Sequence, residues 1–278
     1  MKCKYKFKVY TEGWSNPYID EQIELGLSVI TESDYSFESN NNVDISLFID
    51  ELKENKCDSV ALCGFRDEHI REIIPYIKDK KMVCLKSPYL TNFIFLEELG
   101  EVETILIDWN LKATKLWSVK SNKKLKKLYI VDANKLENFD GLRNASLENL
   151  SIFGCNYFSS YYPKLAIKDL SFLFEIPNLK RLELHIKKTE SDEWYLAFLS
   201  NLTFLDYLFI PTNFFTFHDF ALLSKALFKT SGIEPYWGDD KDGYFIIGKG
   251  SPKNLKTLEE AKKWEIKFNE IKNKWLNK

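Results

Sequence analysis

The sequence predicts an α/β protein built as a solenoid, with a parallel β-sheet on its concave face and short helices or 3-10 turns on its convex face. Three observations support this fold class: one apolar pattern recurs along the chain, its copies return at a nearly regular spacing, and a small polar residue closes several of them. A single amphipathic helix steps by three and four residues and does not produce such strands. The alternative, a globular α/β domain with evenly spaced strands, leaves the closing residues unexplained.

The repeated pattern is an apolar residue, an apolar-x-apolar strand that starts three positions later, and an Asn or Cys three positions after the strand. The complete copies are Val102, Ile105, Ile107 and Asn110; Leu147, Leu150, Ile152 and Cys155; and Leu205, Leu208, Ile210 and Asn213. Two degenerate copies end in other residues: Leu125, Leu128 and Ile130 with Ala133, and Leu179, Leu182 and Leu184 with Lys187.

The spacing of the copies predicts seven strands between about Val60 and Asn213. The second apolar residue of each strand recurs at Leu62, Leu85, Ile107, Ile130, Ile152, Leu184 and Ile210, with intervals of 22 or 23 residues up to Ile152 and then of 32 and 26. Upstream of the strands, apolar residues keep stepping by three, which suits 3-10 turns better than long helices. A helix is nevertheless expected in 64–80, bent or restarted at Pro75.

This pattern resembles the leucine-rich repeat family, and most of all its short, 22-residue bacterial and cytosolic type. The resemblance implies a solenoid in which the Asn or Cys after each strand turns inward and satisfies backbone groups of the neighbouring coil. Cys155 is therefore first a structural candidate. The resemblance assigns no catalytic residue.

The chain divides into three predicted segments. Residues 1–55 form an N-terminal cap with two alternating strands, residues 56–213 form the repeats, and residues 214–278 form a C-terminal cap with a strand near 244–247. The last helix starts at Thr257, which makes a capping box with Glu260. Its apolar stripe suits a helix docked over the last repeat or a self-association seam, and the sequence leaves both open. The oligomeric state is not predicted.

Composition excludes several classes of function. The net charge of −2 gives no overall attraction to nucleic acid or to an anionic membrane, and no apolar run is long enough to span a bilayer. The first ten residues alternate Lys with apolar positions instead of forming a signal peptide. The five cysteines are odd in number and form no C-x-x-C pair, which favours reduced thiols and a cytoplasmic location.

No motif in the sequence predicts catalysis, a cofactor or a metal site. His69, His185 and His218 do not have metal-ligand spacing on a helix. The Gly-rich segment at 248–251 lacks the order of a phosphate loop, and 238–249 lacks the ligands of a calcium loop. No cysteine follows Cys155, so a cysteine-dependent ubiquitin ligase domain after the repeats is excluded.

Strand alternation predicts which side chains face a partner, because residues between the core positions point to the concave face. The predicted partner-binding residues combine aromatic and charged groups, as protein interfaces do: Tyr129, Phe153, Arg181, Glu183, His185, Tyr207 and Phe209. The stretched repeat adds an aromatic segment, which is either a local packing element or a secondary surface: Tyr157, Phe158, Tyr161 and Tyr162.

The sequence thus predicts a non-catalytic module that binds a protein of unknown identity through its concave face. The specific hypothesis is a toxin-neutralising immunity or inhibitor protein, because a small unfused solenoid suits inhibition by occlusion. The alternatives from other classes are an enzyme, or a homotypic assembly protein, with its function in the 214–278 segment.

Overall fold

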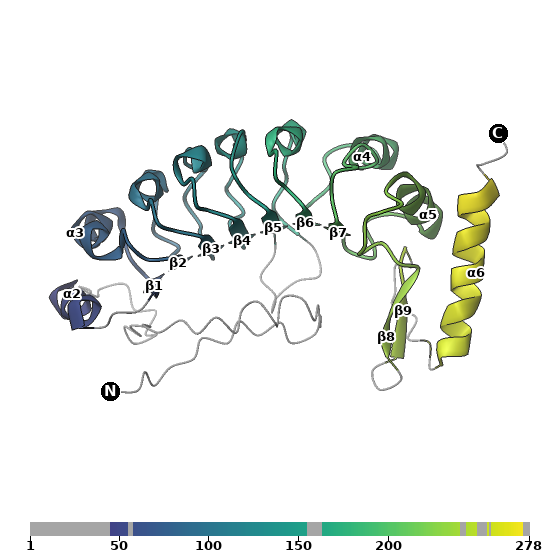
Figure 1. Ribbon diagram of the computed structural model, residues 1–278, viewed down its shortest axis with the longest axis horizontal. Coiled ribbons are helices and arrows are strands. Elements are labelled where there is room, and N and C mark those ends of the chain that lie inside the picture. Colours follow the sequence, from purple (N-terminus) through teal and green to yellow (C-terminus); the bar gives the residue numbers. More distant parts are fainter. Residues whose placement is uncertain are drawn as a thin grey trace. The chain divides into compact units, whose positions relative to one another are not determined.

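Figure 1 shows the computed structural model, which describes residues 45–54, 58–154, 163–239, 243–248, 255 and 257–274. The chain is an α/β protein, as predicted, with a seven-stranded sheet in the order β1 to β7 and a separate two-stranded ribbon, β8–β9. It forms two compact units, Met1–Asn178 and Leu179–Lys278, which are described separately.

The first unit contains five strands that pair in parallel and in register. They are β1 (Ser59–Cys63), β2 (Met82–Lys86), β3 (Thr104–Asp108), β4 (Lys127–Val131) and β5 (Asn149–Phe153). The predicted core positions, such as Val60, Leu85 and Ile107, are buried almost completely. The residues that lie between the two core positions of each strand form one row across the sheet: Ala61, Cys84, Leu106, Tyr129 and Ser151. The sequence therefore predicted both the strands and their register.

The return segments of the first unit are mostly 3-10 turns, as the stepping by three predicted. They are η1 (Ile94–Glu98), η2 (Val119–Ser121), η3 (Asp140–Leu142) and η4 (Ser171–Glu175), and the helices are α2 (Ile45–Glu54) and α3 (Asp67–Ile77). The helix α3 is not restarted at Pro75 but runs through it and ends two residues later. Pro75 lacks the amide that would donate to the carbonyl of Arg71, so the helix continues for its last two residues without that hydrogen bond.

Side chains of Asx type begin three of these turns. The Oδ1 atoms of Asn92, Asn138 and Asp169 accept hydrogen bonds from the amides two residues on, at 3.1, 2.9 and 2.7 Å. These side chains supply the partner that an amide at the start of a short turn lacks. The repeat pattern does not include them, so the sequence reading missed them.

Asn110 closes its repeat in the predicted way. It is buried, its Nδ2 donates to the carbonyls of Ser87 and Leu90 at 3.1 and 2.9 Å, and its Oδ1 accepts from the amides of Lys112 and Ala113 at 3.2 and 2.8 Å. One amide side chain thus satisfies four backbone groups of two successive coils.

Asn122 is a second buried amide that bonds the preceding return segment, and the sequence did not predict it. It is buried, its Nδ2 donates to the carbonyls of Leu96 and Leu99 at 2.7 and 2.9 Å, and its Oδ1 accepts from Trp117 Nε1 at 2.7 Å.

The second unit has longer, more helical connections. Its elements are β6 (Arg181–His185), α4 (Asp192–Leu199), β7 (Tyr207–Phe209), α5 (Phe217–Ala226), β8 (Tyr236–Asp239), β9 (Gly243–Ile246) and α6 (Leu258–Lys274). β6 and β7 are parallel, and β8 and β9 are antiparallel. Asn213 was predicted to turn inward after β7, and this prediction is wrong because its side chain is exposed. The chain turns there through a Phe214 amide to Pro211 carbonyl bond of 2.8 Å instead.

The terminal helix α6 packs within its own unit, against α5 and the β8–β9 ribbon (Figure 1). Its Trp264 and Phe268 rings make edge contacts with Phe217, at centroid distances of 5.3 and 5.4 Å. The hydroxyl of Thr257 accepts from the Glu260 amide at 3.3 Å, at the predicted start of the helix. Most of the apolar stripe of α6 is therefore used inside the chain.

Several predictions concern residues outside the described ranges. They are the two strands of the N-terminal cap, the closing role of Cys155, the aromatic segment 157–162 and the position of Trp275 on the terminal stripe.

Candidate functional site

The predicted partner-binding residues lie on the sheet face opposite the core positions, in both units. In the first unit, Tyr129 is half-buried at the middle of β4 and Phe153 is buried at the end of β5. In the second unit, the residues come from two adjacent strands: Arg181, Glu183 and His185 on β6, and Tyr207 and Phe209 on β7. The register pairs Arg181 with Tyr207 and Glu183 with Phe209, so strand pairing brings these four together.

A charged and aromatic cluster forms on β6 and β7. The guanidinium of Arg181 donates from Nε and Nη2 to Glu183 Oε1, at 2.9 and 2.5 Å. Its central carbon lies 3.6 Å from the centroid of the Tyr207 ring. Arg181 is thus held from the side by a carboxylate and from the face by an aromatic ring, and both contacts favour the planar guanidinium over a lysine.

The cluster is poorly solvated for a charged group on a sheet. Glu183 is 1% exposed and the Arg181 side chain is 16% exposed. Removing two charges from water is expensive, and the mutual attraction compensates only when the geometry is close. The arrangement fixes the donors and the ring before any ligand arrives, which lowers the entropy cost of binding. His185 and Phe209 beside it are half-buried.

A second charged cluster, at the ends of β2, β3 and β4, was not predicted. Lys86 Nζ lies 3.6 Å from Asp108 Oδ2, and Asn134 Nδ2 donates to Asp132 Oδ1 at 2.5 Å. Burial raises the pKa of Asp108, with a smaller contribution from the Asp132 charge, and Lys86 opposes this rise. Burial also raises the pKa of Asp132, against the opposing bond from Asn134. The Lys86–Asp108 pair could have been predicted from the sequence, because the two residues occupy equivalent positions in successive repeats.

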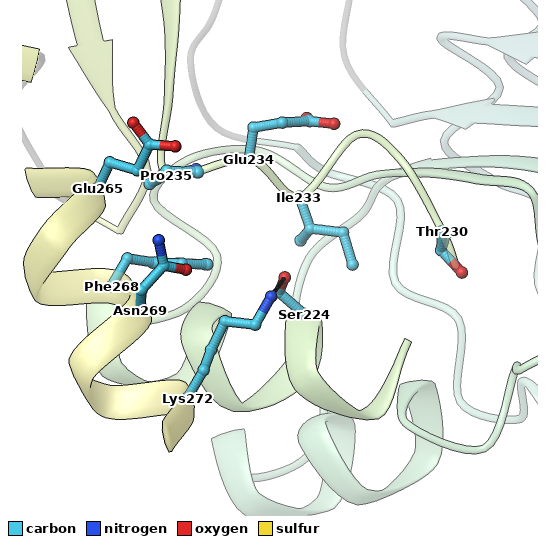
Figure 2. Close-up of a pocket in the computed structure, with 9 residues that line it drawn as sticks. All are labelled: Ser224, Thr230, Ile233, Glu234, Pro235, Glu265, Phe268, Asn269 and Lys272. Atoms are coloured by element: carbon cyan, nitrogen blue, oxygen red, sulfur yellow. Dashed lines mark hydrogen bonds between the residues drawn. The ribbon is translucent and has the colours of Figure 1, made fainter. Parts of the chain in front are cut away.

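A small pocket lies beside α6 in the second unit (Figure 2). Its volume is about 170 Å³, below the usual range of ligand pockets. Lys272 Nζ donates to Ser224 Oγ at 3.1 Å at its edge, and Glu234 and Glu265 lie at its rim (Figure 2). The lining residues are Ser224, Thr230, Ile233, Glu234, Pro235, Glu265, Phe268, Asn269 and Lys272.

Metal and membrane features were searched over the described ranges only. There, no group of three or more His, Cys, Asp or Glu side chains has the geometry to hold a metal ion. Within the same ranges, no helix combines the length and the apolar character that crossing a membrane requires. Cys84 is buried.

Comparison of the chain with protein-family models and with curated proteins finds no match.

Proposed function

We propose that this protein is a leucine-rich repeat solenoid that binds another protein through the concave face of its sheet and has no catalytic role. The observation that carries the proposal is the Arg181–Glu183–Tyr207 cluster on β6 and β7. Arg and Tyr are among the residue types that dominate binding energy in protein interfaces, most of all when their side chains are held in place before binding.

The chemistry of this face favours a protein over other ligands. It combines a guanidinium, a carboxylate, an imidazole and aromatic rings on two strands, and such a mixture of both charge signs suits protein surfaces. A nucleic acid would require an excess of positive charge, and the chain carries a net charge of −2. A small molecule would require an enclosed pocket, whereas these residues lie along a sheet face.

The resemblance to cytosolic bacterial repeat proteins supports a cytoplasmic location as part of this proposal. Within the protein-binding class, an immunity or inhibitor protein for a toxin remains the specific hypothesis, because occlusion of an active site needs a preformed surface and no chemistry of its own.

Affinity capture from the native cell, followed by mass spectrometry, tests the proposal. A His185→Ala, Phe209→Ala variant removes two side chains of the face. A Phe228→Ala variant removes an exposed ring two residues after α5 and serves as the matched control. A hot-spot pair contributes about 2 kcal/mol or more to binding. We therefore expect the His185→Ala, Phe209→Ala variant to capture about 30-fold less of the partner than the native chain, and the Phe228→Ala variant to capture as much as the native chain. Equal capture by both variants would show that the concave-face assignment is wrong.

A further inference from the structure

Three successive loops of the first unit present an aromatic ring and two cations at one edge of the sheet. The loops follow β1, β2 and β3, which are parallel and in register, so they leave the same edge at neighbouring points. The third residue after each strand occupies an equivalent position: Arg66, Tyr89 and Leu111. Lys112 comes next in the third loop. All four residues are exposed, and together they form the edge patch.

Buried polar side chains hold the three loops together beneath the edge patch. The Oγ of Ser87 donates to the carbonyl of Phe65 at 2.6 Å and accepts from the amide of Tyr89 at 3.1 Å. Asn110 joins this loop to the next one, because its Nδ2 donates to the Ser87 carbonyl at 3.1 Å and its Oδ1 accepts from the Lys112 amide at 3.2 Å. The backbone under the patch is thus fixed before any ligand arrives, which lowers the entropy cost of binding.

The two cations of the edge patch share one aromatic ring. The guanidinium carbon of Arg66 lies 4.9 Å from the centroid of the Tyr89 ring, and Lys112 Nζ lies 6.0 Å from it. Within the part of the chain that the structure describes, neither cation has a carboxylate at ion-pair distance. The adjacent carboxylate of Asp67 accepts from the amide and the hydroxyl of Thr91 instead. Two like charges beside one ring therefore attract an anion.

The edge patch also carries apolar surface. Tyr89 is 37% exposed and Leu111 is 43% exposed, next to the two cations. Arg and Tyr side chains are among those that dominate the energy of protein interfaces. A small anion such as phosphate would use the charges alone and leave the apolar side chains in water. A nucleic acid would be opposed by the net charge of −2. The combination favours a protein segment in which carboxylates flank an apolar residue.

We propose that the edge patch binds an acidic segment of a partner protein. Carboxylates of Asp or Glu side chains pair with Arg66 and Lys112, and an apolar side chain between them packs on Tyr89 and Leu111. The patch lies in the first unit, whereas the β6–β7 cluster lies in the second. The proposal therefore adds a second surface to the proposed function and does not depend on the first. Since exposed charges are screened by salt, a higher ionic strength should weaken binding.

Subtractive selection from random peptides displayed on phage tests the proposal without a known partner. The library is cleared on the Arg66→Gln, Lys112→Gln variant and then selected on the native full-length chain. We expect the enriched peptides to carry Asp and Glu around an apolar residue. A matched selection is cleared on a Lys120→Gln, Lys123→Gln variant, which loses two exposed cations elsewhere in the same unit, and should enrich no such peptides. Absence of acidic peptides from the first selection, or equal enrichment in both, overturns the proposal.

Fluorescence polarisation of a selected, labelled peptide gives an independent measurement, and circular dichroism checks that each variant is folded. Tyr89→Ala should raise the Kd about tenfold, because an aromatic anchor contributes strongly to binding. Ile94→Ala, which removes a 56% exposed apolar side chain from η1, should leave the Kd unchanged. An unchanged Kd in Tyr89→Ala overturns the proposal, and so does displacement of the peptide by inorganic phosphate or oligothymidylate as readily as by unlabelled peptide.

The same assay separates the edge patch from the concave face. The His185→Ala, Phe209→Ala variant should bind the acidic peptide with the native Kd. Loss of peptide binding in this variant would place the peptide on β6 and β7 and overturn the edge patch. Failure of the edge patch in these tests leaves the concave-face proposal intact, since that proposal is tested by capture of its own partner.

Discussion

The two units satisfy the backbone hydrogen-bonding groups of their return segments in different ways. In the first unit, the returns after β2, β3 and β4 contain 3-10 turns, and buried amide side chains such as Asn110 and Asn122 bond backbone groups of neighbouring return segments. In the second unit, the return from β6 to β7 takes 26 residues and contains the regular helix α4. A helix satisfies most of its own backbone groups.

This difference explains why Asn213, the predicted closing residue of the second unit, does not turn inward. The helices α4 and α5 begin with Ser191 and Thr216, whose hydroxyls accept from the amides of Trp194 and Asp219. With helices capped in this way, no inward amide is needed after β7, and Asn213 is exposed. The 3-10 returns on either side of β3 therefore use buried amides, and the helical returns of the second unit use helix caps.

The largest expected effect is the loss of Asn110. The Asn110→Ala variant leaves the carbonyls of Ser87 and Leu90 and the amides of Lys112 and Ala113 without their side-chain partner in a buried place. Since each orphaned buried group costs about 1–3 kcal/mol, we expect the free energy of unfolding to fall by about 4 kcal/mol. Urea denaturation followed by circular dichroism measures it.

The matched substitution in the second unit is Asn213→Ala. Its side chain is exposed, so the expected change is below about 0.5 kcal/mol. Similar losses for the two variants would remove the distinction between the units.

The next effect concerns the buried charges of the second unit. In the Arg181→Met variant, the carboxylate of Glu183 stays buried without the guanidinium, and we expect a loss of about 3 kcal/mol in the free energy of unfolding. The Arg181→Met, Glu183→Leu double variant should regain most of this loss, because no buried charge remains. A double variant as unstable as the single one would indicate that packing rather than charge compensation holds the pair.

A smaller difference is expected between the stability lost on removing a helix cap in the second unit and that lost on removing a turn cap in the first unit. Thr216→Ala removes a capping box in which the hydroxyl accepts from the Asp219 amide at 3.2 Å, and we expect a loss of about 1 kcal/mol. Asn92→Ala removes one bond to the Ile94 amide at the exposed start of η1, with an expected loss of about 0.5 kcal/mol. Thermal and urea unfolding of both variants gives the order, and a larger loss for Asn92→Ala would contradict it.

The sequence predicted the strands and their register because burial on one side of a sheet imposes strict alternation, as at Ile105 and Ile107. It predicted Asn110 because that residue follows the repeat pattern. It missed Asn122, which stands where other repeats carry an apolar residue such as Leu99 or Leu202, and whose role is identified by the carbonyls around it. It was wrong for Asn213, since a pattern of residues does not report whether the coil that needs the amide is present.

The candidate site was predicted only in part. Alternation placed Arg181, Glu183 and Tyr207 on one face, but the sequence did not show that Arg181 contacts both of the others, because such contacts depend on rotamers and strand register. It treated Glu183 and Phe153 as side chains that face a partner, whereas both are buried. Burial of a sheet face depends on segments distant in sequence, which no local periodicity describes.

The smallest effect is a pH dependence that contrasts two carboxylates of the first unit, Asp108 and Asp169. The carboxylate of Asp108 lies 3.6 Å from Lys86, and its pKa is raised, chiefly by burial. A raised pKa means that the folded chain holds this proton more tightly than the unfolded chain. The contribution of Asp108 to stability is therefore lost as the pH rises from the unfolded value near 3.8 through the folded pKa.

The Asp108→Asn variant should accordingly gain stability relative to the native chain between pH 3.5 and pH 7. The pKa of Asp169 is lowered, mainly by the Ser171 amide, so its stabilisation is present above the unfolded pKa and is lost as the pH falls through the folded pKa. Asp169→Asn should thus lose stability relative to the native chain over the same interval. Urea denaturation at the two pH values measures both, and shifts of the same sign would contradict the assignment, because burial and hydrogen bonding act in opposite directions on a carboxylate.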